Sequence, residues 1–122
     1  MPFTFPGESS MSDPLYEPVT AAEAIAEKSF STFTVKGVDI AICRFRDEYF
    51  AIKNHCSHAD STFIGGRMRG YRIMCPLHGA TFDIRSGEAT GAPATRPIDT
   101  YPVRVKDGMV EVDLGGAIKP AG

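Results

Sequence analysis

Two short segments of this chain each place a cysteine and a histidine close together. His55-Cys56-Ser57-His58 contains the pattern Cys-x-His, and Cys75-Pro76-Leu77-His78 contains the pattern Cys-x-x-His. Sixteen residues separate His58 from Cys75. Thiolates and imidazoles are common protein ligands of transition metals. Two chelating segments, each with one sulfur and one nitrogen, can therefore hold a compact metal centre from two sides.

A structural zinc ion and a two-iron cluster both accept two cysteines and two histidines. Zinc fingers usually keep the cysteines together and the histidines together, whereas here each segment is mixed. The mixed pattern favours a [2Fe–2S] cluster in which one iron takes both thiolates and the other takes both imidazoles. The predicted ligands of this cluster, one per chain, are Cys56, His58, Cys75 and His78. A non-redox structural zinc module is the alternative from another class of protein.

Two further residues compete for a place in the site. His55 is adjacent to Cys56, and adjacent loop residues point apart, so we expect His55 to be an exposed or hydrogen-bonded histidine rather than a ligand. Cys43 lies in the apolar run Ile40-Ala41-Ile42-Cys43 and is expected to be a small buried hydrophobe. Three cysteines also make an odd count for a disulfide framework.

Most of the remaining sequence predicts β-strands joined by tight turns. Apolar residues alternate at period two over segments 30–35, 38–45, 49–52, 101–105 and 110–114. The predicted turns between these strands are Lys36-Gly37, Arg46-Asp47 and Asp107-Gly108. An Asp-Gly pair between two alternating runs is a strong hairpin signal. The pattern therefore predicts an all-β sandwich or barrel.

Three segments depart from this alternation. Thr20-Ala21-Ala22-Glu23 matches a capping box and predicts one or two turns of helix over Ala21–Glu27. Segments 54–66 and 75–97 hold all three histidines, two cysteines and three prolines, which is typical of rigid loops on a β scaffold. Between them, Arg67-Met68-Arg69 is bracketed by glycines and is expected to be a turn with solvated arginines.

Length and charge limit the class of protein. A chain of 122 residues with 43% hydrophobic residues suits one domain with one modest core. The formal net charge of −2 gives no basic footprint for nucleic acid. No apolar run approaches the roughly 20 residues that span a bilayer, and the first residues lack the features of a signal peptide. We therefore expect a cytoplasmic protein with no membrane partner.

Residues 1–13 are expected to be a flexible tail, and either Met1 or Met11 could be the start.

The two segments resemble the cluster-binding loops of Rieske iron–sulfur proteins. Cys75–Asp83 resembles the second loop running into its strand, and Ser86-Gly87-Glu88 resembles the turn that follows. Gly91–Ala94 is similar to the proline loop that covers the cluster. The resemblance extends over about residues 14–114, which leaves 115–122 as a C-terminal tail. It implies an antiparallel β-sandwich base carrying a small subdomain, with cluster-binding loops at about 54–66 and 75–97.

The resemblance also separates subclasses within the family. Respiratory Rieske proteins carry an extra cysteine in each loop, and the matching residues here are Ser61 and Leu77, so that disulfide cannot form. Their cluster also receives hydrogen bonds from serine and tyrosine hydroxyls, whereas the matching residues here are Ala80 and Phe82. Hydroxyls directed at sulfur stabilise the reduced state. Without them we predict a potential toward the low end of the range of about −150 to +300 mV.

The free-standing ferredoxins of bacterial multicomponent aromatic-ring dioxygenases resemble this chain most. That resemblance implies a non-enzymatic electron carrier, expected to be a monomer, that takes single electrons from a flavoprotein reductase and delivers them to a terminal oxygenase. The alternative within electron transfer is the Rieske-like small subunit of a nitrite reductase. The substrate of the system and the particular partners are not encoded in a carrier.

Residues that flank the loops have two interpretations. The apolar residues beside the loops are Phe63, Ile64, Leu77 and Pro93. Some of them are expected to shield the cluster, and packing beneath the loops is favoured over direct contact with a partner. Asp83 either fixes the second loop by hydrogen bonding or simply ends a strand.

Overall fold

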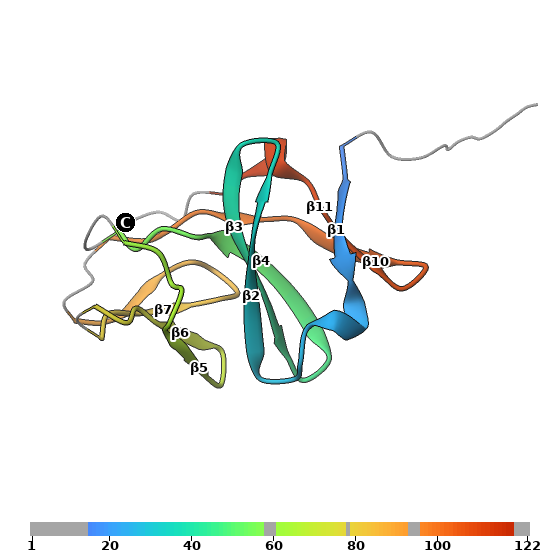
Figure 1. The fold of residues 1–122 in the computed structure, drawn as a ribbon. Helices are drawn as coiled ribbons and strands as arrows, with labels where there is room; N and C mark the ends of the chain where they lie inside the picture. The colour runs from blue at the N-terminus through green and yellow to red at the C-terminus, as the bar shows by residue number, and fades with distance from the viewer. Residues whose placement is uncertain (1–14, 58–60, 78, 93–95, 119–122) are drawn as a thin grey trace, which may run out of the picture.

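The chain forms three antiparallel sheets in a computed structural model that describes residues 15–57, 61–77, 79–92 and 96–118 (Figure 1). The strand orders are β1-β11-β10, β2-β3-β4-β9 and β5-β6-β7-β8. Two short 3-10 helices, Ala22–Ala24 and Leu114–Gly116, are the helical elements of the described chain. The predicted all-β class is confirmed. The described residues contain no helix with the length and apolar character needed to cross a membrane.

The central sheet begins with the two hairpins that the sequence predicts. Its first three strands are β2 (Ser29–Val35), β3 (Val38–Phe45) and β4 (Glu48–Lys53). Both central residues of each hairpin turn have positive φ, at 51° and 79° in Lys36-Gly37 and at 53° and 61° in Arg46-Asp47. Such turns match the right-handed twist of the paired strands.

The Arg46-Asp47 turn contains no glycine, so another group must stabilise its left-handed backbone. The carboxylate of Glu27 accepts hydrogen bonds from the backbone N–H of Arg46 (2.7 Å) and of Asp47 (3.0 Å). These bonds to Asp47 and Arg46 hold the pKa of Glu27 below its ordinary value.

The one or two helical turns predicted over Ala21–Glu27 are reduced to a single 3-10 turn, Ala22–Ala24. Residues Glu17–Ala21 form strand β1, and only one 3-10 turn follows it. Thr20 pairs with Val110 of strand β11 (Met109–Val112), and the backbone N–H of Ala22 donates to the carbonyl of Gly108 (2.8 Å). No side chain caps the 3-10 turn. Pairing with a distant strand therefore overrides the local helix signal.

The central sheet lies between the other two sheets and is buried on both faces (Figure 1). Successive side chains of a strand point to opposite faces. Ile40 and Ile42 of β3 belong to one buried core with Val110 and Val112. Ala41 and Cys43 belong to a second core with residues of the loops and of the β5–β8 sheet. The near-continuous apolar run in β3 thus reflects burial on two sides.

The strand predicted over residues 101–105 is interrupted at Pro102. Thr100–Tyr101 (β9) pairs with β4 of the central sheet, whereas Val103–Lys106 (β10) pairs with β11 of the next sheet. Proline lacks a backbone N–H and suits the point where the chain leaves one sheet for another. Beyond β11, Ile118 exchanges two backbone hydrogen bonds with Thr100 (3.0 and 2.7 Å).

The segment between β4 and β9 carries the predicted site. Its two ends are neighbours, since Ala51 pairs with Tyr101 and the N–H of Lys53 donates to the carbonyl of Asp99 (2.9 Å). Its strands are β5 (Arg67–Arg69), β6 (Arg72–Met74), β7 (Thr81–Asp83) and β8 (Ala89–Gly91). The expectation of a turn at Arg67-Met68-Arg69 is wrong, because these residues form β5 and the turn follows at Gly70.

Candidate metal centre

The two predicted cysteine ligands stand at the starts of two closed loops. The N–H of Cys56 donates to the carbonyl of Ser61 (2.8 Å), and the N–H of Cys75 donates to the carbonyl of Ala80 (2.8 Å). Gly79, with φ of +78°, also donates its N–H to the carbonyl of Cys75 (3.1 Å). The other two predicted ligands, His58 and His78, lie outside the described residues. In sequence, each of them falls between the two closing residues of its loop.

Both cysteines are fully buried in the same apolar core. Cys56 and Cys75 are each 0% exposed, and both belong to the core that also contains Phe63 and Phe82. These two rings pack edge to face with centroids 5.6 Å apart. The structure therefore brings the two predicted thiol ligands into one water-excluded region, although eighteen residues separate them in sequence.

A buried asparagine fixes the base of the first loop. Asn54 is only 5% exposed. Its side-chain Oδ1 accepts a hydrogen bond from the N–H of Phe63 (2.9 Å), and its own N–H donates to the carbonyl of Asp39 on β3 (3.0 Å). One residue therefore joins both ends of the 54–63 segment to the central sheet. The sequence motif gave no indication of this role, because asparagine is common in loops.

The end of the first loop and the start of the second are in close contact. A Cβ atom on Gly66 would clash with the carbonyl oxygen of Met74 and would lie 3.2 Å from Cδ of Pro76. The N–H of Gly66 also donates to the carbonyl of Phe63 (2.8 Å). Only glycine fits at this position, so Gly66 sets how closely the two loops approach.

A third segment is hydrogen-bonded to the first loop. The hydroxyl of Ser57 donates to the carbonyl of Arg96, and Nη2 of Arg96 donates to the carbonyl of Ser57 (3.2 Å). Arg96 follows the segment that contains Pro93, which lies outside the described residues. Sequence reasoning missed Arg96, since nothing local links it to a residue 39 positions earlier.

The apolar residues around the loops separate into buried and exposed groups. Phe63 is fully buried, as the packing interpretation expects, but Ile64 is 62% exposed and Leu77 is 53% exposed. The expectation that these residues pack beneath the loops is therefore wrong for Ile64 and Leu77. Ile64 directly follows buried Phe63, and Leu77 follows Pro76, which is itself exposed.

Comparison with known proteins identifies the arrangement. The Rieske [2Fe–2S] domain family matches residues 16–102. The chain belongs to this family. The anthranilate 1,2-dioxygenase ferredoxin subunit of Burkholderia cepacia is 35% identical over 82% of this chain and 93% of that protein. The naphthalene 1,2-dioxygenase ferredoxin component of Pseudomonas putida is 36% identical over 77% of this chain and 90% of that protein.

Solved structures agree with this assignment. The ferredoxin of carbazole 1,9a-dioxygenase from Nocardioides aromaticivorans IC177 superposes with a TM-score of 0.77 at 29% identity, covering 87% of this chain and 98% of that one. The ferredoxin of Sphingomonas yanoikuyae B1 superposes with a TM-score of 0.75 at 31% identity, covering 80% and 96%. The predicted Rieske fold, a β-sandwich base with a cluster-binding part, is confirmed.

The Rieske cluster chemistry fits the residues present. Soft thiol ligands suit iron–sulfur clusters, and the structure places two of them in an apolar core on loops with independent closures. Ala80 and Phe82 are both fully buried beside Cys75 in this core, and neither has a hydroxyl. Ser61 and Leu77 provide no thiol for the respiratory disulfide. Cys43 is fully buried on β3, and burial strongly raises the pKa of its thiol.

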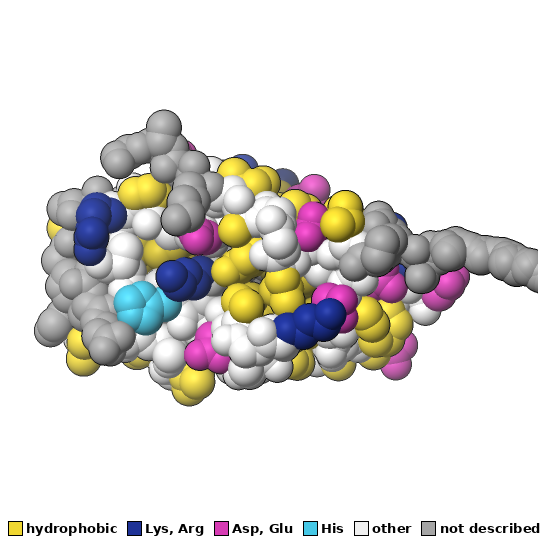
Figure 2. Space-filling view, turned by 90° about the horizontal axis from the view of Figure 1, so that it is seen from above, with side chains coloured by type: hydrophobic (Ala, Val, Ile, Leu, Met, Phe, Trp, Pro, Cys, Tyr) yellow, Lys and Arg dark blue, Asp and Glu magenta, His cyan; other side chains and the backbone are white. Residues whose placement is uncertain are grey.

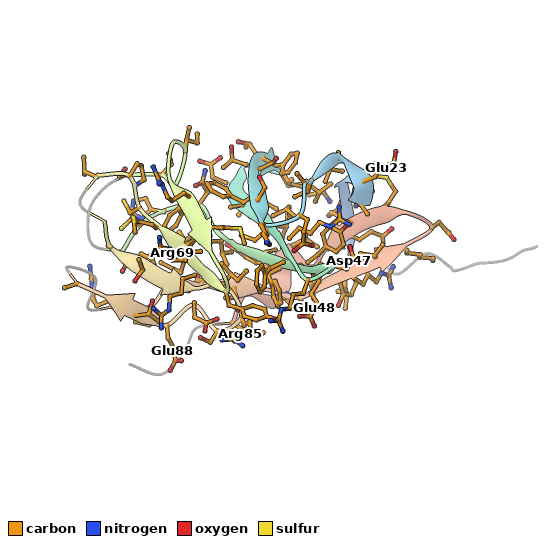
Figure 3. The ribbon with its side chains drawn as sticks, turned by 90° about the horizontal axis from the view of Figure 1, so that it is seen from below. Glu23, Asp47, Glu48, Arg69, Arg85 and Glu88 are labelled. Carbon is orange, nitrogen blue, oxygen red and sulfur yellow. The ribbon has the colours of Figure 1, made fainter. Side chains whose placement is uncertain are left out.

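An aromatic and ionic cluster, packed against the core that holds the two cysteines, joins the Rieske loop region to the central sheet. The ring of Tyr71, in the β5–β6 turn, packs edge-on against Phe45 (4.6 Å) and Phe50 (6.0 Å). Its hydroxyl donates to Oε1 of Glu48 (3.0 Å), which raises the pKa of Tyr71. The guanidinium of Arg85 lies 4.0 Å from the Tyr71 ring centroid. Figure 3 shows Glu48 and Arg85 close together on this side.

Asp83 organises the turn that follows β7. Its carboxylate accepts hydrogen bonds from the N–H of Arg85 (2.7 Å) and from the guanidinium of Arg85 (3.1 and 2.8 Å). Burial raises the pKa of Asp83, but these bonds and the positive charge of Arg85 outweigh burial and hold the pKa below its ordinary value. Asp83 is the last residue of β7, as the strand-end interpretation expects, and the hydrogen bonds of its carboxylate with Arg85 lie in the following turn rather than in the cysteine loop.

Proposed function

We propose that this chain is the ferredoxin component of a bacterial ring-hydroxylating dioxygenase system. It takes single electrons from a flavoprotein reductase and passes them to a terminal oxygenase, and it performs no catalysis itself. The observation that carries this proposal is the pair of closed loops that bring Cys56 and Cys75 into one buried core beside exposed Ile64 and Leu77. The chain covers 90% or more of two dioxygenase ferredoxins but only 32% of a carbazole dioxygenase oxygenase chain.

The proposed ligands are the four residues of the two Cys/His segments. Cys56 and Cys75 would hold one iron through their thiolates, and His58 and His78 would hold the other through their imidazoles. When bound, the cluster accepts and releases one electron. The surrounding core keeps water away from the thiolates, and Gly66, Asn54 and the Ser57–Arg96 pair keep the loops in position. Exposed Ile64 and Leu77 offer an apolar contact for a partner. We further propose that the protein acts as a cytoplasmic monomer.

Ligand substitutions test the site. The purified protein should be red-brown and show a Rieske visible and EPR spectrum. His58→Ala, His78→Ala, Cys56→Ser and Cys75→Ser should each abolish that spectrum. His55→Ala and Cys43→Ser are matched controls and should retain it. A colourless protein containing one zinc ion would favour the zinc module, and loss of the spectrum in the His55→Ala variant would overturn the ligand assignment.

Reconstitution of the electron-transfer chain tests the proposed role as a carrier. The holoprotein should support product formation by a terminal oxygenase encoded by a neighbouring gene, with a reductase and reduced nicotinamide as the electron source. Transfer to a nitrite reductase, with none to an oxygenase, would instead support the nitrite reductase alternative.

A further inference from the structure

The outer face of the β5–β6 hairpin carries three arginines. In the antiparallel register Arg67 pairs with Met74 and Arg69 pairs with Arg72. Directly paired residues project from the same face of a sheet. Arg67, Arg69 and Arg72 are all exposed, while Ile73, on the opposite face, is fully buried. We call Arg67, Arg69 and Arg72 the arginine face.

This arrangement is electrostatically unfavourable for the isolated chain. Arg69 and Arg72 are like charges directly opposite each other across two strands, which destabilises a sheet. Within the part of the chain that the structure describes, no carboxylate forms a salt bridge with any of the three. The strand register places one carboxylate residue, Asp83, directly opposite Arg72. The carboxylate of Asp83 is already bonded to Arg85.

The charges of the whole chain are also divided between its two parts. Segment 54–97 contains five arginines against three carboxylates, a formal charge of +2, while the rest of the chain has eight basic and twelve acidic residues, a formal charge of −4. Of the residues labelled in Figure 3, Arg69, Arg85 and Glu88 lie on the cluster-binding side, and Glu23 and Asp47 lie toward the other end. Figure 2 shows the opposite side of the molecule, where hydrophobic, basic and acidic side chains are intermingled.

The arginine face borders the second ligand loop. The three arginines line a groove of about 440 Å³ whose remaining wall includes Cys75, Pro76 and Gly79. A protein seated over this groove would therefore contact the backbone that carries a cluster ligand. Close approach to the ligand loops is what electron transfer between proteins requires, and complementary charges accelerate and orient such encounters.

We infer that the arginine face is a docking surface for a carboxylate-rich patch on the terminal oxygenase. This inference rests on the proposed function and adds to it the site and the charge of the contact. The oxygenase is the partner because a related ferredoxin, which superposes on this chain with a TM-score of 0.77, is seen in complex with an oxygenase. Carboxylates on that partner would supply counter-charges for Arg67, Arg69 and Arg72, which form no salt bridge among the described residues.

Stopped-flow oxidation of the reduced holoprotein by the oxygenase tests the inference. At about 20 mM ionic strength, Arg69→Glu/Arg72→Glu should lower the second-order rate constant about tenfold or more, and the difference should shrink to about twofold in 0.5 M salt. Lys36→Glu/Lys106→Glu changes the net charge equally on the other part of the chain and should stay within about twofold of the parent. Arg69→Lys/Arg72→Lys should retain most of the rate.

Two further measurements separate this inference from the proposed function. The visible spectrum of every variant should equal that of the parent, which shows that the site is intact, and the measured potential of each variant gives the driving force at which its rate is compared. If the parent itself transfers no electrons to the oxygenase, the proposed function fails. If the parent transfers electrons but the two double charge reversals have equal rates at every salt concentration, the docking inference fails. It also fails if Arg69→Glu/Arg72→Glu slows reduction by the reductase and leaves oxidation by the oxygenase unchanged.

Discussion

Replacing Ala80 with serine should raise the reduction potential of the cluster. Ala80 is fully buried in the core that holds Cys75, and its carbonyl accepts the N–H of Cys75 at 2.8 Å. A serine adds one hydroxyl at a position where the family's high-potential members place such a donor. An unpaired hydroxyl in this apolar core would cost about 1–3 kcal/mol. The hydroxyl therefore needs an acceptor, and a sulfur of the cluster would supply one when the cluster is bound.

The size of the shift follows from the charge on the acceptor. Two ferric ions, two sulfides and two thiolates sum to zero, and reduction adds one negative charge. A hydrogen bond to a neutral partner stabilises by about 0.5–1.5 kcal/mol, and a hydrogen bond to a charged partner stabilises by about 1.5–3 kcal/mol. The reduced state therefore gains about 1–2 kcal/mol more than the oxidised state. For a one-electron couple, where about 59 mV corresponds to a factor of ten, the potential should rise by about 40–90 mV.

A redox titration at pH 7, followed by visible absorption and EPR, measures this shift. Ala51→Ser is the matched control, because Ala51 is equally buried but belongs to the core shared with Val110 and Val112. The control should leave the potential within about 20 mV of the parent, whose own value should lie toward the low end of the Rieske range. A clearly positive potential in the parent, or an intact spectrum with no shift in Ala80→Ser, would refute the reasoning.

Two further changes test groups that hold the site together. Asn54→Ala removes the acceptor of the buried Phe63 N–H and should cost about 1–3 kcal/mol, seen as faster loss of the visible spectrum on heating. An unchanged half-life would argue against Asn54 as a closure of the first loop. Asp83→Asn should destabilise the fold by about 1 kcal/mol at neutral pH. Because the folded-state pKa of Asp83 is lowered, its contribution is present above the unfolded pKa of about 3.9 and disappears as pH falls through the folded value. Urea unfolding followed by circular dichroism should therefore show the stabilities of the variant and the parent converging as pH falls below the unfolded pKa, and a difference that stays constant as the pH is lowered would contradict this.

Local signals in the sequence were sufficient to predict the hairpins and the proximity of the two cysteines. Asp107-Gly108 and Lys36-Gly37 adopt the positive φ angles that their turns require, and such residues carry this information themselves. The Cys56 and Cys75 spacing likewise predicts a shared site, and the structure places both residues in one core.

Elements that depend on distant partners were not predictable in this way. Strand β1 pairs with β11 at the other end of the chain, so the sequence, read locally, predicted no strand there and a helix from its last residue, Ala21, onward. The arginine-rich β5 lacks an apolar alternation because only Met68 faces the core side. The hydrogen bonds between Ser57 and Arg96, and the contact between Gly66 and the second loop, arise only once the loops are brought together in space.

The two-sided burial of β3 has a consequence for how the protein unfolds. One face of β3 packs into one core through Ile40 and Ile42, and the other face packs into the second core through Ala41 and Cys43. Displacing β3 therefore disrupts both cores at once. The base and the ligand loops should therefore behave as a single cooperative unit. Damage to the metal site would then be transmitted to the whole domain, and a ferredoxin that has lost its cluster would become a preferred target of cellular proteases.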